Sequence, residues 1–249
     1  MQSTVAEAIT LEHSVTSTTG SPAFDFHFEV DNSTTLKNPK SPNFNNAKAT
    51  PGNFPANNTA DFTGPIPATG IPNTATIKFS WTSGLLETNS ILDAFWTDQN
   101  VQKLGASVKP TRVDWHFLNN PDGTVTLDIF SPDSVDFSSV ELWTGLSEAN
   151  LEGPNFFDLQ GPLPGATQIF SDGSGAVGER GQILAITYLP SGLNYDVFRM
   201  VTSTDVVAIA FNSEIHEPPS ALLLLSALLV LYVAHGRRSR TRCRCTKSG

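Results

Sequence analysis

The sequence predicts a mainly β protein with an antiparallel β-sandwich or jelly-roll-like domain, and three observations support this. Phe, Gly and Pro number 16, 18 and 17 among 249 residues, whereas Met occurs twice. Phe together with turn-forming residues favours strands over helices. Short apolar segments alternate with polar residues, and clusters of turn formers separate them, as in all-β domains. A composition of 39% hydrophobic and 16% charged residues excludes a wholly disordered chain.

Alternation of apolar and polar residues locates the individual strands. In 24–31, three Phe residues and Val30 fall on one face and polar residues fall on the other. Residues 195–201 are expected to pair with the near-continuous apolar run 206–211, because turn formers separate the two. The other segments with strand character are 77–81, 113–117, 125–129, 140–142 and 182–189.

Turn chemistry and apolar content place some of these strands relative to one another. The turn formers at 119–123 predict a hairpin between 113–117 and 125–129. The apolar runs 182–189 and 206–211 are expected in the middle of a sheet, where both faces of a strand are buried.

Two segments depart from the strand pattern. Residues 32–73 contain nine Asn and seven Pro, which predicts a long loop or disordered insert because Pro removes donors from a sheet. A short helix is predicted from Ser90, which can cap it with Asp93 three residues on, to Gly105, which can end it. The apolar positions of this helix include Leu92, Phe95 and Trp96.

Charge divides the chain into an acidic body and a basic tail. All 24 acidic and nine basic residues lie in 1–217, which therefore carries 9 − 24 = −15, whereas 235–249 holds six Lys or Arg and no acid. An acidic body repels a phosphate backbone, which argues against nucleic-acid binding. The only cysteines, Cys243 and Cys245, lie in the tail, so the body has no disulfide framework and no Cys-based metal site.

The stretch 221–234 is uncharged and apolar on every face, which excludes a surface amphipathic helix. As a helix it would be about 21 Å long, and flanking residues that reach the interface extend it toward a hydrocarbon core of about 30 Å. We interpret it as a membrane anchor, and a buried core helix is the alternative. The anchor residues include Ala221, Leu222, Leu225, Leu228, Leu231 and Ala234.

Basic residues follow this stretch at once and indicate its orientation. Arg237, Arg238 and Arg240 stand where the positive-inside rule expects a cytoplasmic flank. The body would then lie on the non-cytoplasmic side. The sequence thus predicts an acidic β domain over 1–213 and a C-terminal module over 214–249.

A short polar Pro motif precedes the anchor, and it reads His216-Glu217-Pro218-Pro219-Ser220. Motif, apolar helix and basic tail (235–249) in this order resemble the PEP-CTERM sorting signal of Gram-negative bacteria. Glu217 and Pro218 match the last two positions of its Pro-Glu-Pro motif, and His216 stands in place of the first Pro. The resemblance covers 216–242.

The resemblance implies export through the inner membrane, recognition by an exosortase and association with exopolysaccharide or biofilm matrix. Met1 to Gly20 contain neither a positive n-region nor an apolar h-region. Proteins with this signal ordinarily begin with a signal peptide, so we expect the natural start to lie upstream of Met1.

Three hypotheses describe the body. The first is a non-enzymatic surface or matrix protein, to which no catalytic residues are assigned. The others are a surface glycoside hydrolase, which needs paired carboxylates in a cleft, and a carbohydrate-binding module, which needs an exposed Trp strip. Core packing is the expected role of Trp81 and Trp115, since both share faces with large apolar residues. Exposure of Trp96 and Trp143 distinguishes the hypotheses.

Metal binding finds limited support in the sequence. The body histidines lack ligand spacing, so no transition metal and no other cofactor is expected. His27 and His116 are expected on the polar faces of strands. Four loop aspartates offer oxygen ligands of the kind that Ca²⁺ takes, although surface and turn roles explain them more simply. They are Asp122, Asp133, Asp136 and Asp172.

Overall fold

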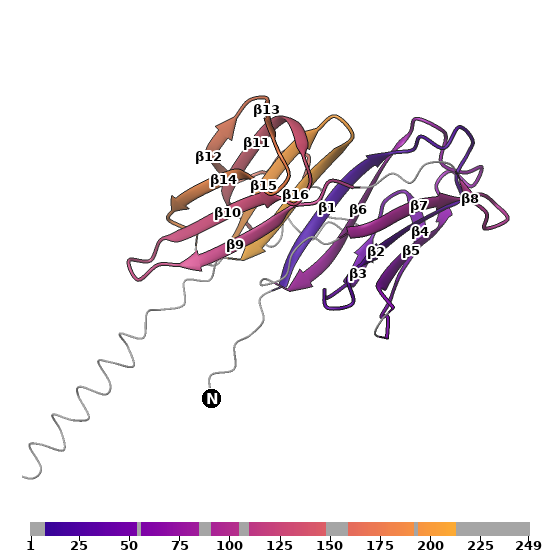
Figure 1. Ribbon diagram of the computed structural model, residues 1–249, viewed down its shortest axis with the longest axis horizontal. Coiled ribbons are helices and arrows are strands. Elements are labelled where there is room, and N and C mark those ends of the chain that lie inside the picture. Colours follow the sequence, from indigo (N-terminus) through magenta and orange to yellow (C-terminus); the bar gives the residue numbers. More distant parts are fainter. Residues whose placement is uncertain are drawn as a thin grey trace, which may run out of the picture.

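The computed structural model describes residues 8–53, 56–84, 91–104, 110–147, 159–191 and 194–212, which form sixteen strands in three antiparallel sheets (Figure 1). The strands are Ala8–Thr16 (β1), Asp25–Val30 (β2), Lys37–Lys40 (β3), Phe44–Thr50 (β4), Asn58–Pro65 (β5), Thr76–Gly84 (β6), Ile91–Thr97 (β7), Lys103–Leu104 (β8), Asp114–Asn119 (β9), Val125–Ser131 (β10), Val135–Leu146 (β11), Thr167–Asp172 (β12), Gly175–Val177 (β13), Gly181–Tyr188 (β14), Tyr195–Thr202 (β15) and Asp205–Asn212 (β16).

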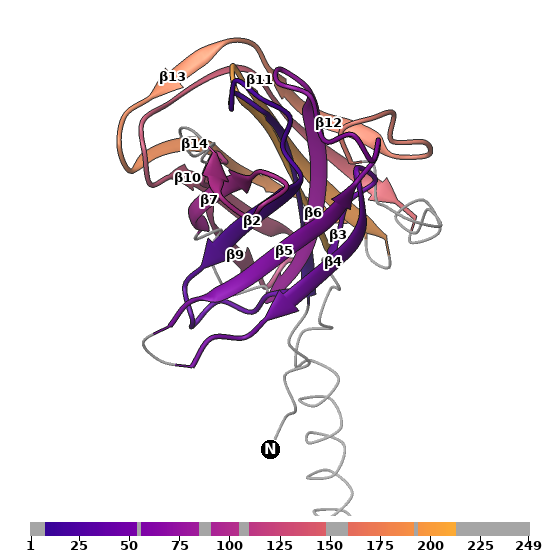
Figure 2. The ribbon, with the colours of Figure 1, turned by 90° about the vertical axis from the view of Figure 1, so that its right-hand side faces the viewer.

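An eight-stranded main sheet runs through the whole body. Its order is β12-β11-β15-β16-β1-β6-β3, with β13 also paired to β11. A three-stranded sheet, β14-β10-β9, lies beside one half of the main sheet, and a five-stranded sheet, β4-β5-β2-β7-β8, lies beside the other half (Figures 1 and 2). The body is therefore two β-sandwich halves that share the main sheet.

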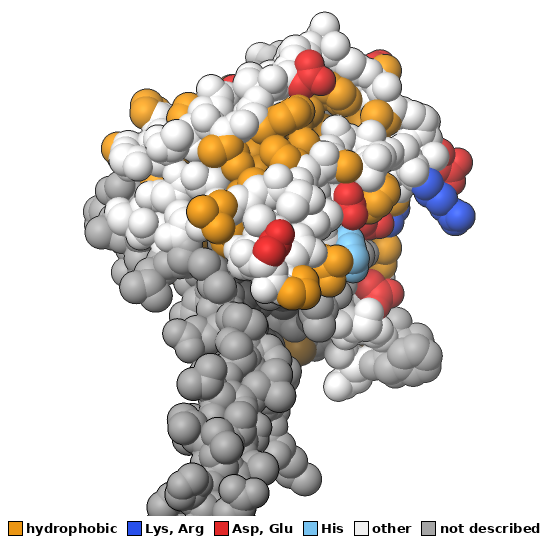
Figure 3. Space-filling view, turned by 90° about the vertical axis from the view of Figure 1, so that its left-hand side faces the viewer, with side chains coloured by type: hydrophobic (Ala, Val, Ile, Leu, Met, Phe, Trp, Pro, Cys, Tyr) orange, Lys and Arg blue, Asp and Glu red, His pale blue; other side chains and the backbone are white. Residues whose placement is uncertain are grey.

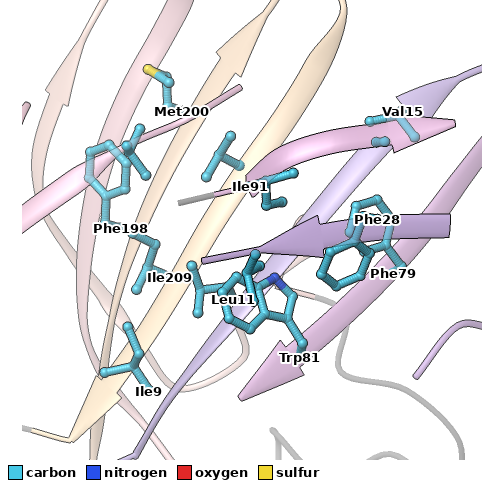
Figure 4. Packing of buried hydrophobic residues seen from close by; sticks show 14 of the residues in the cluster. Ile9, Leu11, Val15, Phe28, Phe79, Trp81, Ile91, Phe198, Met200 and Ile209 are labelled. Carbon is cyan, nitrogen blue, oxygen red and sulfur yellow. The ribbon is translucent and has the colours of Figure 1, made fainter. Parts of the chain in front are cut away.

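Aromatic side chains fill the half that contains the five-stranded sheet. Phe28 on β2 lies 5.2 Å from Phe79 and 5.9 Å from Trp81 on β6, measured between ring centroids (Figure 4). Phe26 lies 4.8 Å from the ring of Trp96 on β7. All five side chains are fully buried. Tilted aromatic pairs at these distances stabilise a core beyond the burial of their area.

The half with the three-stranded sheet has a core of mainly aliphatic side chains, with Phe198 and Phe211 among them. Side chains of β9 and β10 meet those of β1 and β16, where Ile9 and Ile209 are buried, and the space left between them is about 10 Å³. Trp115 and Phe117 close one side of this core and remain partly exposed. Close packing of this kind is what a large-to-small substitution would disturb.

Most strands predicted from alternation are confirmed. The hairpin of β9 and β10 pairs Phe117 with Leu127, and β15 pairs with β16 as expected. β16 lies between β15 and β1, in the middle of the main sheet. Residues 182–189 form a strand as predicted, but the prediction that it lies in the middle of a sheet is wrong. β14 is the terminal strand of its sheet. Its alternate residues Gln182, Ala185 and Thr187 are exposed.

The prediction of a loop or disordered insert over 32–73 is wrong, because β3, β4 and β5 lie within it. Phe44 and Phe62 are buried there and supply the apolar anchors. Pro39 belongs to a terminal strand and Pro65 ends β5, positions where a missing donor is tolerated. Asn side chains replace backbone donors and acceptors, as where Asn43 Oδ1 accepts the Lys78 amide at 2.9 Å.

The predicted helix after Ser90 is also wrong, since 91–97 form β7 and pair with β2. Ile91, Ala94 and Trp96 are buried, whereas Leu92 is 40% exposed. A register shift at Glu29 and Val30 of β2 interrupts the alternation of β7, so its sequence imitates a helical spacing. Ser90 and Gly105 lie outside the described residues.

The C-terminal hydrophobic helix predicted over 221–234, like the rest of 214–249, lies outside the described residues. The part of the chain that the structure describes contains no helix with the length and apolarity needed to cross a membrane.

Candidate functional site

A polar cleft of about 310 Å³ opens beside residues 110–112, which precede β9. The turn between β10 and β11 and the turn between β15 and β16 form its other walls. Its charged side chains are Arg112, Asp133 and Asp136, and six Ser and Thr residues add hydroxyl groups. A lining of this kind suits a polar ligand that forms hydrogen bonds.

The buried carboxylate of Asp205 fixes the wall of this cleft. Asp205 Oδ2 accepts the Thr111 amide at 2.8 Å and lies 3.0 Å from His13 Nδ1, while Oδ1 accepts the Ser14 amide at 3.0 Å. Asp205 begins β16 after a two-residue turn, where Thr202 Oγ1 accepts its backbone amide. These donors compensate the desolvation of the carboxylate and tie the segment before β9 to the main sheet.

His13 is not available for chemistry in the cleft. Its side chain is fully buried, and its ring stacks on Phe79 with 5.3 Å between centroids. The carboxylate of Asp205 occupies Nδ1. Asp–His pairs serve as general-base systems only where a substrate reaches the imidazole, so this pair has a structural role.

Opposite charges meet at the mouth of the cleft. Arg112 Nη1 lies 3.7 Å from Asp133 Oδ2. Burial raises the pKa of the Asp114 carboxyl, the charge of Arg112 lowers it, and repulsion by Asp133 raises it further. Asp114 Oδ1 and Arg112 Nε are buried without a hydrogen-bond partner among the described residues. The cleft thus offers a cation beside acceptors, a combination that binds hydroxyl groups as well as ions.

A second charged cluster lies on the opposite face of the main sheet. In register across β11, β15, β16 and β1 stand Glu141, Arg199, Ala208 and Glu12. Arg199 donates to Glu141 Oε2 at 2.9 and 2.5 Å.

Two charged residues of this row, Arg199 and Glu12, hold the segment 159–161. Arg199 Nη1 donates to the carbonyl oxygens of Gln160 and Gly161 at 3.0 and 2.9 Å. Glu12 Oε2 accepts the Leu159 amide at 2.9 Å. Leu159 packs over Val197 and Ala208 of the sheet. Hydrogen bonds from this charged row therefore hold segment 159–161 against the face of the main sheet.

The two histidines predicted on polar strand faces have different surroundings. His27 Nδ1 lies 2.7 Å from Asp61 Oδ1, and its ring stacks on Phe95 with 4.8 Å between centroids. His116 is 65% exposed and lies 3.8 Å from Asp128. The expected solvent-facing position is confirmed for His116, whereas His27 is only 16% exposed.

A further buried carboxylate closes the end of β14. Asp196 Oδ2 accepts the Tyr188 hydroxyl at 3.0 Å, and Asp196 Oδ1 accepts the Ser191 hydroxyl at 2.9 Å. Burial raises the pKa of Tyr188, and the neighbouring Asp196 raises it further. The phenol therefore stays protonated as a donor.

The four aspartates considered as calcium ligands are divided between separate places. Asp133 and Asp136 share the cleft, whereas Asp122 accepts the Thr124 amide in the β9–β10 turn and Asp172 accepts the Gly173 amide after β12. Within the described ranges, no three His, Cys, Asp or Glu residues are grouped as metal ligands.

The tryptophans do not form an exposed strip. Trp81 and Trp96 are fully buried, which confirms core packing for Trp81. Trp115 packs against the core from its edge. Trp143 is partly exposed, and its indole donates to Glu141 at 3.0 Å.

The predicted sorting motif, membrane anchor and basic flank, which span 216–240, lie outside the described residues. Sequence reasoning missed His13, Asp205, Glu12 and Arg199. One signal was available, because charged residues inside strands that are otherwise apolar indicate buried pairs. Their partners lie up to 192 residues away and only the fold reveals them. No protein-family model, curated protein or solved structure matches this chain.

Proposed function

We propose that this chain is an exported bacterial surface or matrix protein without enzymatic activity, which an exosortase recognises through its C-terminal signal. The observation that carries the proposal is the order of motif, apolar stretch and arginine cluster over 216–240. Export would require no disulfide formation in the body, because the body contains no cysteine.

Physical reasons support recognition of Glu217 in particular. Pro218-Pro219 prevent the membrane helix from continuing upstream and hold the preceding residue in extended backbone. Glu217 is then presented at the non-cytoplasmic surface, where a membrane enzyme reaches it. The arginines after Ala234 resist translocation and fix the orientation.

The fate of the tail tests the proposal. One epitope is placed after Gly249 and a second in the exposed β9–β10 turn at Pro121-Asp122, and a functional signal peptide is added at the N-terminus. In a host with an exosortase, the mature chain is expected to keep the turn epitope and lose the tail epitope. In a host without the enzyme, both epitopes are expected on one chain.

A matched pair of variants identifies the recognised residue. Glu217→Ala is expected to block loss of the tail without changing membrane insertion, because the apolar stretch and the arginines are intact. Glu214→Ala removes the same charge outside the motif and is expected to behave as the wild type. Retention of both epitopes in the exosortase-bearing host would leave a plain membrane anchor.

Saccharide binding or hydrolysis by the body is the second candidate function. The cleft favours it, because Asp133, Asp136 and Arg112 stand among hydroxyl groups there. Burial of Trp96 weighs against it, since this indole has no face for a sugar ring. The test is retention and turnover of a panel of oligosaccharides, neutral and acidic. Loss of either activity in Asp133→Asn, but not in Asp172→Asn, would support the candidate.

A further inference from the structure

The acidic body contains a basic segment. Residues 32–86 hold four lysines and one acid, a net charge of 4 − 1 = +3. The rest of 1–217 holds five basic and 23 acidic residues, a net charge of 5 − 23 = −18. Positive charge is thus concentrated in this one stretch of the body, which Asp31 and Glu87 flank.

The fold gathers the four lysines at one end of the molecule. Lys37 and Lys40 belong to β3, Lys48 to β4 and Lys78 to β6. β3 is a terminal strand of the main sheet and β4 of the five-stranded sheet, and the two lie together at the right of Figure 1. We call these lysines the basic edge. The single acid of the segment, Asp61, stands in register beside Lys48 on the neighbouring strand and lies 2.7 Å from His27.

The basic edge borders a hollow of about 450 Å³. Lys40 and Asn45 contribute polar groups to it, and Pro42 and Ile66 contribute apolar surface. Ile66 is 50% exposed. A partly apolar hollow with a charged rim has the composition of a protein-docking surface, in which polar groups surround an apolar centre.

The complementary charge lies on the half formed by β9 to β16, which we call the acidic half. Its exposed carboxylates are Asp122, Asp133, Asp136, Asp172 and Glu179. In Figure 1 this half lies at the left, opposite the basic edge. Its end face in Figure 3 shows acidic side chains around a hydrophobic patch.

We propose that the basic edge of one copy docks on the acidic half of a second copy, so that the chains associate head to tail. The partner is a second copy because each chain carries both complementary surfaces, and charge complementarity sets orientation and partner choice. The two surfaces differ, so the contact is heterologous and extends into a row of copies unless its rotation closes a ring. The inference concerns the described body alone and does not rest on the sorting signal.

Side chains rather than strand addition would make this contact. Pro39 removes a donor from β3, and exposed Lys48 stands on β4. Proline and lysine on terminal strands prevent edge-to-edge pairing. The association should therefore respond to salt, as contacts between exposed charges do.

Sedimentation velocity of the full chain in an uncharged detergent tests the proposal. The wild type is expected to associate at about 0.05 M salt and to dissociate at about 0.5 M, where the Debye length is several-fold shorter. Lys37→Glu/Lys48→Glu is expected to weaken association at low salt about tenfold or more. Asn100→Glu/Gln102→Glu/Lys103→Glu makes the same change in net charge at exposed residues around β8, on the opposite edge of the five-stranded sheet from β4, and is expected to associate as the wild type.

Mutual rescue separates this contact from general charge effects. Asp133→Lys/Asp136→Lys/Asp172→Lys reverses charge on the acidic half and is expected to lose association by itself. Mixed with Lys37→Glu/Lys48→Glu, it is expected to regain association, because each variant again finds an opposite surface. Circular dichroism confirms that both variants keep the β fold. The C-terminal basic tail is the same in every variant and cannot produce the difference.

Three outcomes would overturn the proposal: a monomeric wild type at low salt, equal loss of association in the control variant, or no rescue in the mixture. A wild type that stays monomeric and is retained on polygalacturonate through Lys37 and Lys48 would assign the basic edge to an anionic polysaccharide instead.

Discussion

Charged side chains in the interior set how the segments of this protein meet. Asp205 of β16 receives donors from His13 and the Ser14 amide of β1 and from the Thr111 amide before β9, so one carboxylate joins three parts of the chain. Hydrogen bonds to an ionised group are the stronger ones, and removal of one partner leaves the others buried and unpaired. Asp205 should therefore tolerate substitution poorly.

Asp205→Ala is expected to destabilise the body by about 3–5 kcal/mol, because it leaves two backbone amides and an imidazole without their acceptor. Urea unfolding followed by fluorescence measures the change. Glu179→Ala, at an exposed turn position, should stay within about 0.5 kcal/mol of the wild type. Similar effects of the two substitutions would show that the Asp205 network does not hold the sheets together.

Asp114 gives the body a dependence on pH. Burial raises the pKa of its carboxyl above the ordinary value of 3.8. Between that value and the raised one, the folded state binds more protons than the unfolded state, so stability falls as the pH rises through the window. Asp114→Asn is expected to abolish this decrease in stability. At pH values above the raised pKa, the variant should be more stable than the wild type, as measured by the urea midpoint at a series of pH values.

Asp122 provides a control, because the pKa of its carboxyl is shifted in the opposite direction from that of Asp114. Hydrogen bonds from the Thr124 hydroxyl and amide lower the pKa of its carboxyl. Its contribution to stability is present above 3.8 and is lost as the pH falls through the lowered value. Asp122→Asn should thus be less stable than the wild type at neutral pH, and equal pH profiles for the two variants would contradict the assignment.

Among the elements, β7 shows most clearly how tertiary pairing overrides a local pattern. Its residues Leu92, Phe95 and Trp96 fall on one face of a helix, yet pairing with β2 turns Trp96 inward and Leu92 outward. A strand and a helix therefore predict different effects of a Leu92 substitution on stability.

Trp96→Ala is expected to destabilise the body by about 3–5 kcal/mol, whereas Leu92→Ala should change stability by about 0.5 kcal/mol or less. Equilibrium unfolding in denaturant measures both. A helix with Leu92 on its buried face would make the two substitutions comparably damaging, so a large loss for Leu92→Ala would argue against the strand.

The strands that could be predicted are those with strict alternation, as in β2, β6, β9 and β10. Their pattern is local, and each keeps its period of two without interruption. β4 and β5 were hidden because prolines and asparagines surround few apolar anchors, of which Phe44 and Phe62 are buried. The cleft was not predictable, since Arg112, Asp133 and Thr202 meet only after the sheets form. The separation of these residues along the sequence does not indicate how close together they lie in the fold.

At the scale of the whole molecule, the body ends its last strand at Asn212 and the predicted anchor begins at Ala221. Removal of everything after Ser213 leaves all the described strands intact. The cut chain is expected in the soluble fraction, and the full chain with the membrane. Leu228→Arg should weaken insertion of the full chain, at about 2.5–3.5 kcal/mol for an arginine near the centre of the anchor. Equal solubility of the full and cut chains would refute the anchor.

The place of β1 has a consequence for how the chain acquires its structure. β1 pairs with β6 on one side and with β16 on the other, so its partners are the sixth strand and the last described one. Such long separations along the chain slow folding. Distant segments must lose conformational entropy to meet before their contacts can offset that loss. During synthesis, Leu11 and Val15 stay without their final neighbours until residues 205–212 have emerged. The edge of β1 that faces β16 thus stays without its partner strand until the last described strand has been made. In the export that we propose, the main sheet can close only after β16 has crossed the membrane, so translocation precedes completion of this sheet.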